Sequence, residues 1–170
     1  AVAGPMTQPG AMPSVGASGD GHDADQPVHE GASGLEGMRV LVAEDDDVSR
    51  LVLREMLTGF GVQVNETADG ATMLAHFAAA PYDVVLIDVQ MPVLDGFATL
   101  ERLRALPDGD TVPVALFTAQ KLSVAELAER GIRVAGVVEK PLEMETLVAF
   151  LRGLRAVKGQ GRHDVAGADA

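Results

Sequence analysis

The stretch VVLIDVQMPVLDG, residues 84–96, decides how this sequence is interpreted. Its first four residues are apolar and branched, and a run this short is typical of a strand covered on both faces of a parallel sheet. Asp88 ends the run, and Asp95-Gly96 is a signal for a turn and a helix start. An aspartate at the end of a strand is often only a turn residue, so Asp88 alone does not specify a function.

Apolar runs of this kind recur along the chain. Each is rich in Val, Ile or Leu, and the predicted strands are 38–43, 62–67, 83–88, 112–118 and 134–138. Apolar residues at helical spacing separate the runs, as in the stripe formed by Val48, Leu51 and Val52. Five successive β-α units predict a doubly wound α/β domain with a parallel sheet.

Capping residues indicate where the helices begin and end. Asp69-Gly70 is predicted to open the second helix, and Gly131 to follow the fourth. Asp46 and Asp47 are expected to be a cap and a surface residue at the start of the first helix.

Residues 1–37 are predicted to be a flexible linker rich in Gly, Ala and Pro. They contain five acidic residues, no Lys or Arg and almost no large apolar side chain, so ordering them would bury too little surface. Residues 157–170 look similar and are predicted to be a disordered tail, which leaves 38–156 as the folded domain. Because the chain begins with Ala inside such a stretch, we expect it to be a piece of a larger protein.

Composition excludes several classes of protein. The net charge of −12 argues against sequence-independent nucleic-acid binding, which requires clustered Lys and Arg. The absence of cysteine excludes disulfides, thiolate metal sites and thiol catalysis. No apolar segment reaches the roughly 18 residues of a membrane helix, and no signal peptide pattern opens the chain. We expect a monomeric, cytoplasmic protein, tethered to a membrane only if a larger parent protein holds it there.

Polar residues follow four of the five apolar runs. Glu44-Asp45 follows the first run, Asp88 the third, Thr118 the fourth and Lys140 the fifth. Because the carboxyl ends of parallel strands lie at one edge of a sheet, we expect these side chains to converge. Each residue alone has an ordinary explanation, such as a helix cap or a strand exit, and it is their coincidence that indicates a site.

The charges of this predicted cluster indicate its chemistry. Three carboxylates at Glu44, Asp45 and Asp88 raise each other's proton affinity, and a divalent cation relieves that repulsion. Mg²⁺ prefers a few carboxylate oxygens and keeps several waters, so it leaves room for a phosphoryl oxygen. The Lys140 ammonium and the Thr118 hydroxyl would neutralise the same phosphoryl group. Asp88 is then the predicted nucleophile and phospho-acceptor.

Over residues 38 to about 155 the sequence resembles the response-regulator receiver family of two-component phosphorelay systems. The shared marks are, in order, an acidic pair, an Asp followed by Met-Pro-x-x-Asp-Gly, a Thr-Ala and a Lys-Pro. The resemblance implies a five-stranded sheet in the order 2-1-3-4-5. It also implies that Mg²⁺, or Mn²⁺ in its place, is held by Glu44, Asp45, Asp88 and the backbone carbonyl of Gln90.

The same resemblance implies a partner and a switch. The phosphoryl donor would be a phosphohistidine on a histidine kinase or a histidine phosphotransfer domain, and the domain would assist its own phosphorylation and dephosphorylation. A cis Lys140–Pro141 bond would aim the ammonium inward. Many family members carry an aromatic residue three positions before the lysine, where this chain has Val137. We therefore expect a weaker or different conformational response to phosphorylation.

Several contexts for such a domain stay open at this point. A receiver within a hybrid sensor histidine kinase fits the long linker best. The alternatives are a stand-alone single-domain response regulator and a degenerate receiver that serves only as a docking module. From another class, an aspartyl-phosphate hydrolase would need a second Asp two residues after its nucleophile, where this chain has Gln90.

Overall fold

The computed structural model describes residues 34–160, which alternate strictly between strands and helices. The strands are β1 (Arg39–Ala43), β2 (Gln63–Thr67), β3 (Val84–Asp88), β4 (Val114–Thr118) and β5 (Gly136–Glu139). The helices are α1 (Asp47–Thr58), α2 (Gly70–Ala79), α3 (Gly96–Arg104), α4 (Val124–Glu129) and α5 (Met144–Gln160). All five predicted strands are therefore present, and α3 and α4 are the shortest of the helices.

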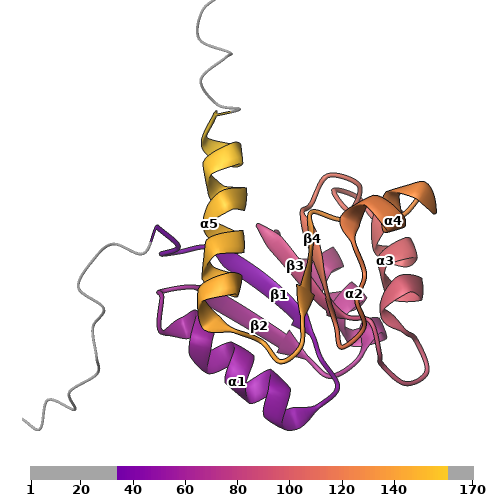
Figure 1. The fold of residues 1–170 in the computed structure, drawn as a ribbon, viewed down its shortest axis with the longest axis horizontal. Helices are drawn as coiled ribbons and strands as arrows, with labels where there is room; N and C mark the ends of the chain where they lie inside the picture. The colour runs from indigo at the N-terminus through magenta and orange to yellow at the C-terminus, as the bar shows by residue number, and fades with distance from the viewer. Residues whose placement is uncertain (1–33, 161–170) are drawn as a thin grey trace, which may run out of the picture.

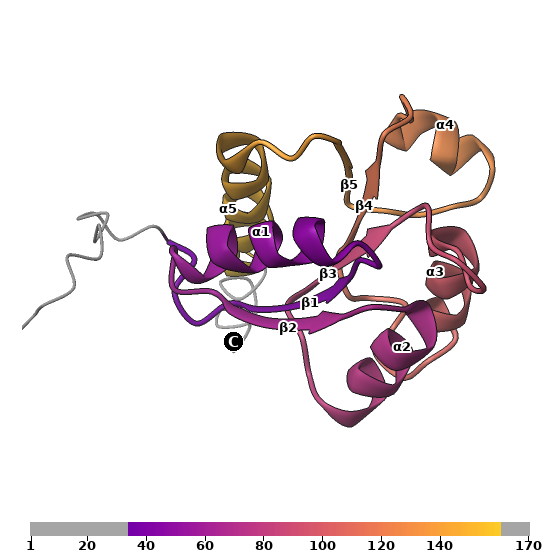
Figure 2. The same ribbon diagram turned by 90° about the horizontal axis from the view of Figure 1, so that it is seen from below.

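The strands form one parallel sheet in the order β2-β1-β3-β4-β5 (Figure 1). Helices cover both of its faces, with α1 and α5 on one and α2 and α3 on the other (Figure 2). Alternate strand residues point to opposite faces, so Val40 and Val42 pack with α1 and α5 while Leu41 packs with α2 and α3. This two-sided burial explains the continuously apolar strand sequences and confirms the predicted doubly wound α/β fold.

Side-chain caps begin the helices where the sequence indicates. The Asp46 carboxylate accepts from the Ser49 amide at 2.7 Å, and the Asp69 carboxylate accepts from the Thr72 amide at 2.7 Å. Gly131 follows α4 with a φ of 76°, a left-handed conformation that glycine adopts without steric cost.

The packed domain extends beyond both predicted boundaries within the described residues. Leu35, assigned from composition to the linker, is 0% exposed and packs in the core beside α1 and α5. The amide of Gly37 donates to the carbonyl of Gly61 at 2.9 Å, which ties this segment to the turn before β2. At the other end α5 continues to Gln160, past residue 156. One leucine in a polar stretch is too weak a signal for composition to detect.

The remainder of the predicted linker and tail, residues 1–33 and 161–170, lies outside the described residues. Within residues 34–160, no helix combines the length and the apolar character needed to span a membrane.

Candidate functional site

The polar residues predicted to converge do meet at the carboxyl edge of the sheet. Glu44 and Asp45 lie directly after β1, Asp88 is the last residue of β3, and each offers a carboxylate oxygen. These three oxygens all lie within 4.8 Å of one another. Glu44 and Asp88 are buried while Asp45 is exposed, so the cluster opens to solvent on the Asp45 side.

Lys140 links the acidic residues of two strands. Its Nζ atom lies 2.9 Å from Oε2 of Glu44 and 2.9 Å from Oδ2 of Asp88. The Lys140 amide donates to the carbonyl of Thr118 at 2.9 Å, and the Lys140–Pro141 peptide bond is cis, as the resemblance implies. An ammonium is thus held between Glu44 and Asp88 although Lys140 is 96 residues from Glu44 in the chain.

Asp88 and Thr118 have neighbouring amides as partners. Oδ1 of Asp88 accepts from the Gln90 amide at 3.0 Å, and the Thr118 hydroxyl oxygen accepts from the Gln120 amide at 2.9 Å. A hydroxyl can accept and donate at once, so the hydrogen of Thr118 stays available to an acceptor in the site. Both side chains are buried at the strand ends.

Burial and charge shift two ionisable groups of the site. Burial raises the pKa of Glu44, and the hydrogen bonds from Lys140 and the Asp46 amide only partly oppose that rise, to which the Asp88 charge adds. Burial alone would lower the pKa of Lys140, but its hydrogen bonds to Glu44 and Asp88 outweigh burial and raise it. Lys140 therefore stays charged at neutral pH.

The donor set fits a hard divalent cation. Three carboxylates lie together and a single ammonium pairs with two of them, so the cluster keeps an excess of negative charge, and its oxygen ligands are those that Mg²⁺ prefers. Burial raises the pKa of Glu44, and a cation beside that carboxylate would favour its charged form.

One contact of the site was missed by the sequence reasoning. The Arg50 guanidinium donates to the backbone carbonyl of Glu44 at 2.8 Å. The only sequence signal is an arginine in the first turn of the helix that follows the acidic pair, a position where an exposed charge is usual.

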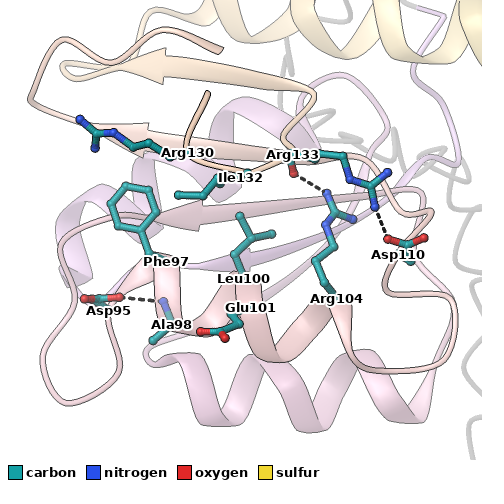
Figure 3. A pocket seen from close by; sticks show the side chains of 11 residues that line it. Asp95, Phe97, Ala98, Leu100, Glu101, Arg104, Asp110, Arg130, Ile132 and Arg133 are labelled. Atoms are coloured by element: carbon teal, nitrogen blue, oxygen red, sulfur yellow. Dashed lines mark hydrogen bonds and ion pairs between the residues drawn. The ribbon is translucent and has the colours of Figure 1, made fainter. Parts of the chain in front are cut away.

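A pocket of about 590 Å³ lies between α3 and residues 130–133 (Figure 3). Its lining contains none of the predicted site residues. Two of its three arginines are engaged: Arg104 donates to the carbonyl of Gly109 at 2.7 Å, and Arg133 pairs with Asp110. The lining carries acidic and basic groups alike, so its charge favours no particular ligand.

Comparison with known proteins shows to which family the chain belongs. The family model of the response regulator receiver domain matches residues 40–152. The chain belongs to the response regulator receiver family. The two-component response regulator ORR41 of Oryza sativa subsp. japonica is 36% identical over 122 residues, which cover 69% of this chain and 94% of that protein.

Receiver domains also occur inside kinases. The peroxide stress-activated histidine kinase mak3 of Schizosaccharomyces pombe is 29% identical over 121 residues, 68% of this chain but only 5% of that protein. A solved structure of the receiver domain of the sensor histidine kinase PA1611 from Pseudomonas aeruginosa PAO1 has a magnesium ion coordinated in its active site cleft. It is 29% identical with a TM-score of 0.64, and the match covers 71% of this chain and 98% of that domain.

Proposed function

We propose that this receiver domain takes a phosphoryl group from a phosphohistidine onto Asp88 and so changes its interactions with partner proteins. The observation that carries the proposal is the position of Lys140, whose ammonium lies 2.9 Å from Asp88 and 2.9 Å from Glu44. A lysine held between two acids at a sheet edge costs desolvation energy. Binding of a phosphoryl group by this ammonium would give the desolvation cost a functional reason.

Each residue of the site has a definite task in this transfer. An Asp88 carboxylate oxygen forms a bond to phosphorus as the bond from phosphorus to the imidazole nitrogen breaks, and that nitrogen keeps the electron pair. Lys140 and the free hydrogen of Thr118 then bind phosphoryl oxygens, because both can donate at the edge of the sheet. The buried position of Asp88 keeps most water away from the resulting acyl phosphate.

The acidic residues would hold the cation that the reaction needs. Glu44, Asp45, Asp88 and the backbone carbonyl of Gln90 are the proposed Mg²⁺ ligands, and Mn²⁺ could take the same place. When bound there, the cation offsets the negative charge of the carboxylates and of the phosphoryl oxygens.

Phosphorylation by a small donor tests the proposal without a partner kinase. Phosphoramidate carries the same phosphorus–nitrogen bond as phosphohistidine, and intact-protein mass spectrometry counts the phosphoryl groups gained. The wild type should gain one group in Mg²⁺ and far less in EDTA, and Asp88→Asn should gain none. Glu55→Gln is the matched control, because Glu55 is an exposed acid further along α1 that pairs with Arg54 and should not alter the gain. Phosphorylation of Asp88→Asn at the wild-type rate would refute Asp88 as the acceptor.

The parent protein is proposed to be a hybrid histidine kinase, with a stand-alone regulator as the alternative. Support comes from the similar kinase receiver and from the polar stretch that precedes the domain. In a hybrid, the phosphorylated domain passes its group on to a histidine phosphotransfer protein. Transfer from phosphorylated wild type to such a protein within minutes supports the hybrid, whereas transfer only from a separate kinase supports the stand-alone regulator.

Two rival roles are weaker. A hydrolase of phosphate esters would use an acid two residues after Asp88, and the Gln90 side chain there cannot transfer a proton. A docking module without phosphorylation would not need to keep Glu44, Asp45, Thr118 and Lys140 together. Turnover of p-nitrophenyl phosphate would favour the first rival, and a lack of phosphorylation by any donor would favour the second.

A further inference from the structure

Arg50, in the first turn of α1, contacts the backbone of the acidic pair rather than its carboxylates. Its Nη1 atom donates to the carbonyl of Glu44 at 2.8 Å and to the carbonyl of Asp45 at 3.4 Å. Its Nη2 atom pairs with the Asp47 carboxylate. The Arg50 side chain is only 18% exposed, so one guanidinium spans the whole segment between β1 and α1.

The two acids before α1 are held in place by different means. Glu44 is buried, its carboxylate is paired with Lys140, and it also accepts from the Asp46 amide at 3.1 Å. Asp45 is exposed, and within residues 34–160 no hydrogen bond holds its carboxylate. The direction of the Asp45 side chain therefore depends on the backbone that carries it.

We propose that Arg50 is a positioning residue that aims the Asp45 carboxylate at the cation site. The inference rests on the proposed function, because it concerns how the same site binds Mg²⁺. The planar guanidinium can bind two carbonyls and a carboxylate at once, which the single ammonium of a lysine cannot do in the same geometry. Contacts that orient metal ligands commonly change metal affinity by about 10-fold or more.

The charge of Arg50 and its contacts have opposite effects on cation affinity. A positive charge beside the site repels Mg²⁺, so removing the charge alone should tighten binding. Loss of the two carbonyl contacts should instead weaken binding, because Asp45 would then have to be ordered when the cation binds. The sign of the change in affinity separates a positioning residue from a residue that merely lies nearby.

The test compares Mg²⁺ dissociation constants, measured by calorimetry, for the wild type and two variants. Arg50→Met should bind Mg²⁺ about 10-fold more weakly than the wild type. Arg54→Met is the matched control: Arg54 lies one turn further along α1, pairs with Glu66 at 3.0 Å and makes no contact with Glu44 or Asp45. That variant removes the same charge from the same helix and should bind Mg²⁺ as tightly as the wild type or slightly more tightly.

Two further measurements keep the inference testable if Arg50→Met folds poorly. Arg50→Lys preserves the charge and should still weaken Mg²⁺ binding, because an ammonium cannot bind two carbonyls and a carboxylate as the planar guanidinium does. In EDTA, the amides of residues 45–48 should exchange hydrogen faster in both Arg50 variants while the β3 amides stay unchanged. Wild-type or tighter Mg²⁺ binding by Arg50→Met would overturn the inference and leave the proposed function intact. If the wild type itself binds no Mg²⁺, both fail.

Discussion

Glu44 is a residue whose burial is unfavourable for the metal-free fold and whose proposed role is to bind a cation. It is buried beside Asp88, and burial raises its pKa despite the ion pair with Lys140. A carboxyl group whose pKa is higher in the folded state destabilises the fold once it must ionise. Burial of the Glu44 carboxylate, with a smaller contribution from the Asp88 charge, is therefore an unfavourable feature that a cation bound at the proposed site would offset.

A pH series on Glu44→Gln measures this effect. Since the folded-state pKa lies above the ordinary value of 4.5, the wild type should lose stability relative to Glu44→Gln as pH rises from 4.5 through the folded-state pKa. Below 4.5 the difference should be constant, because Glu44 is protonated in both states. Urea unfolding in EDTA gives the free energies. A difference that moves in favour of the wild type with rising pH would show that the Lys140 ion pair dominates.

At neutral pH, Mg²⁺ should stabilise the wild type more than a variant that lacks one proposed ligand. A ligand that binds only the folded state adds about 2.7 kcal/mol at 100 times its dissociation constant. We expect this gain for the wild type and a much smaller one for Asp45→Asn, which lacks a proposed ligand. Urea unfolding with Mg²⁺, or with NaCl at equal ionic strength, checks the effect. Equal gains in both proteins would mean that the cation binds elsewhere.

At the scale of elements, the turn from β3 into α3 leaves no room for a side chain at Gly96. A Cβ atom there would lie 2.4 Å from the carbonyl oxygen of Asp88 and 2.7 Å from the Cα atom of Val89. The close approach lets α3 begin directly beside the proposed phospho-acceptor, with Asp95 as its cap.

Gly96→Ala should therefore destabilise the fold by about 1–3 kcal/mol, the usual cost of overpacking. It should also slow phosphorylation, since the backbone of Asp88 must shift. Gly153→Ala in α5 is the matched control, because its added methyl group meets nothing within 4 Å and should stabilise the helix by up to about 1 kcal/mol. Thermal unfolding and the mass-spectrometric assay measure both variants. Equal stability of the two would contradict the crowding at Gly96.

The start of α2 offers a pH-dependent test of a helix cap. The amide and hydroxyl of Thr72 donate to Asp69, which lowers the pKa of that carboxyl below 3.8. Asp69→Ala should cost about 1 kcal/mol at neutral pH. The difference from wild type should be fully present above pH 3.8 and shrink as pH falls through the lower, folded-state pKa. Acid titrations followed by circular dichroism check this, and a pH-independent difference would rule out a charged cap.

At the scale of the whole molecule, the domain has two hydrophobic cores separated by the sheet. One of them includes Leu35, which precedes β1 and lies beside α1 and α5. The segment before the first strand therefore contributes to the stability of the domain and is not only a linker.

Leu35→Ala should destabilise the domain by about 2–5 kcal/mol, the range for leucines in closed cores. Leu51→Ala is the matched control, because Leu51 is 47% exposed on α1 and should change stability by less than about 1 kcal/mol. Urea unfolding gives both values. Similar small effects for the two leucines would place the start of the domain at residue 38 after all.

The pattern of apolar residues predicted the strands and the doubly wound fold, and the structure confirms both. The fold prediction succeeded because strands buried on both faces must be continuously apolar, as Val84 to Ile87 illustrate. The polar residues just after such strands predicted a shared site, and the structure brings Glu44, Asp45, Asp88 and Lys140 together. Leu35 and the last residues of α5 lie outside the predicted domain, because one leucine and one helical turn hardly change the composition of the polar segments that contain them.

The sequence by itself determined the elements and the kind of chemistry available at their ends, since both follow from local patterns of apolar and charged residues. Only the tertiary structure decided that one ammonium bridges Glu44 and Asp88, that Leu35 belongs to the core, and that Arg50 binds the backbone of the acidic pair. These are contacts between particular atoms, often far apart in the chain. Their distances depend on how the helices and the sheet pack together, which no local pattern contains.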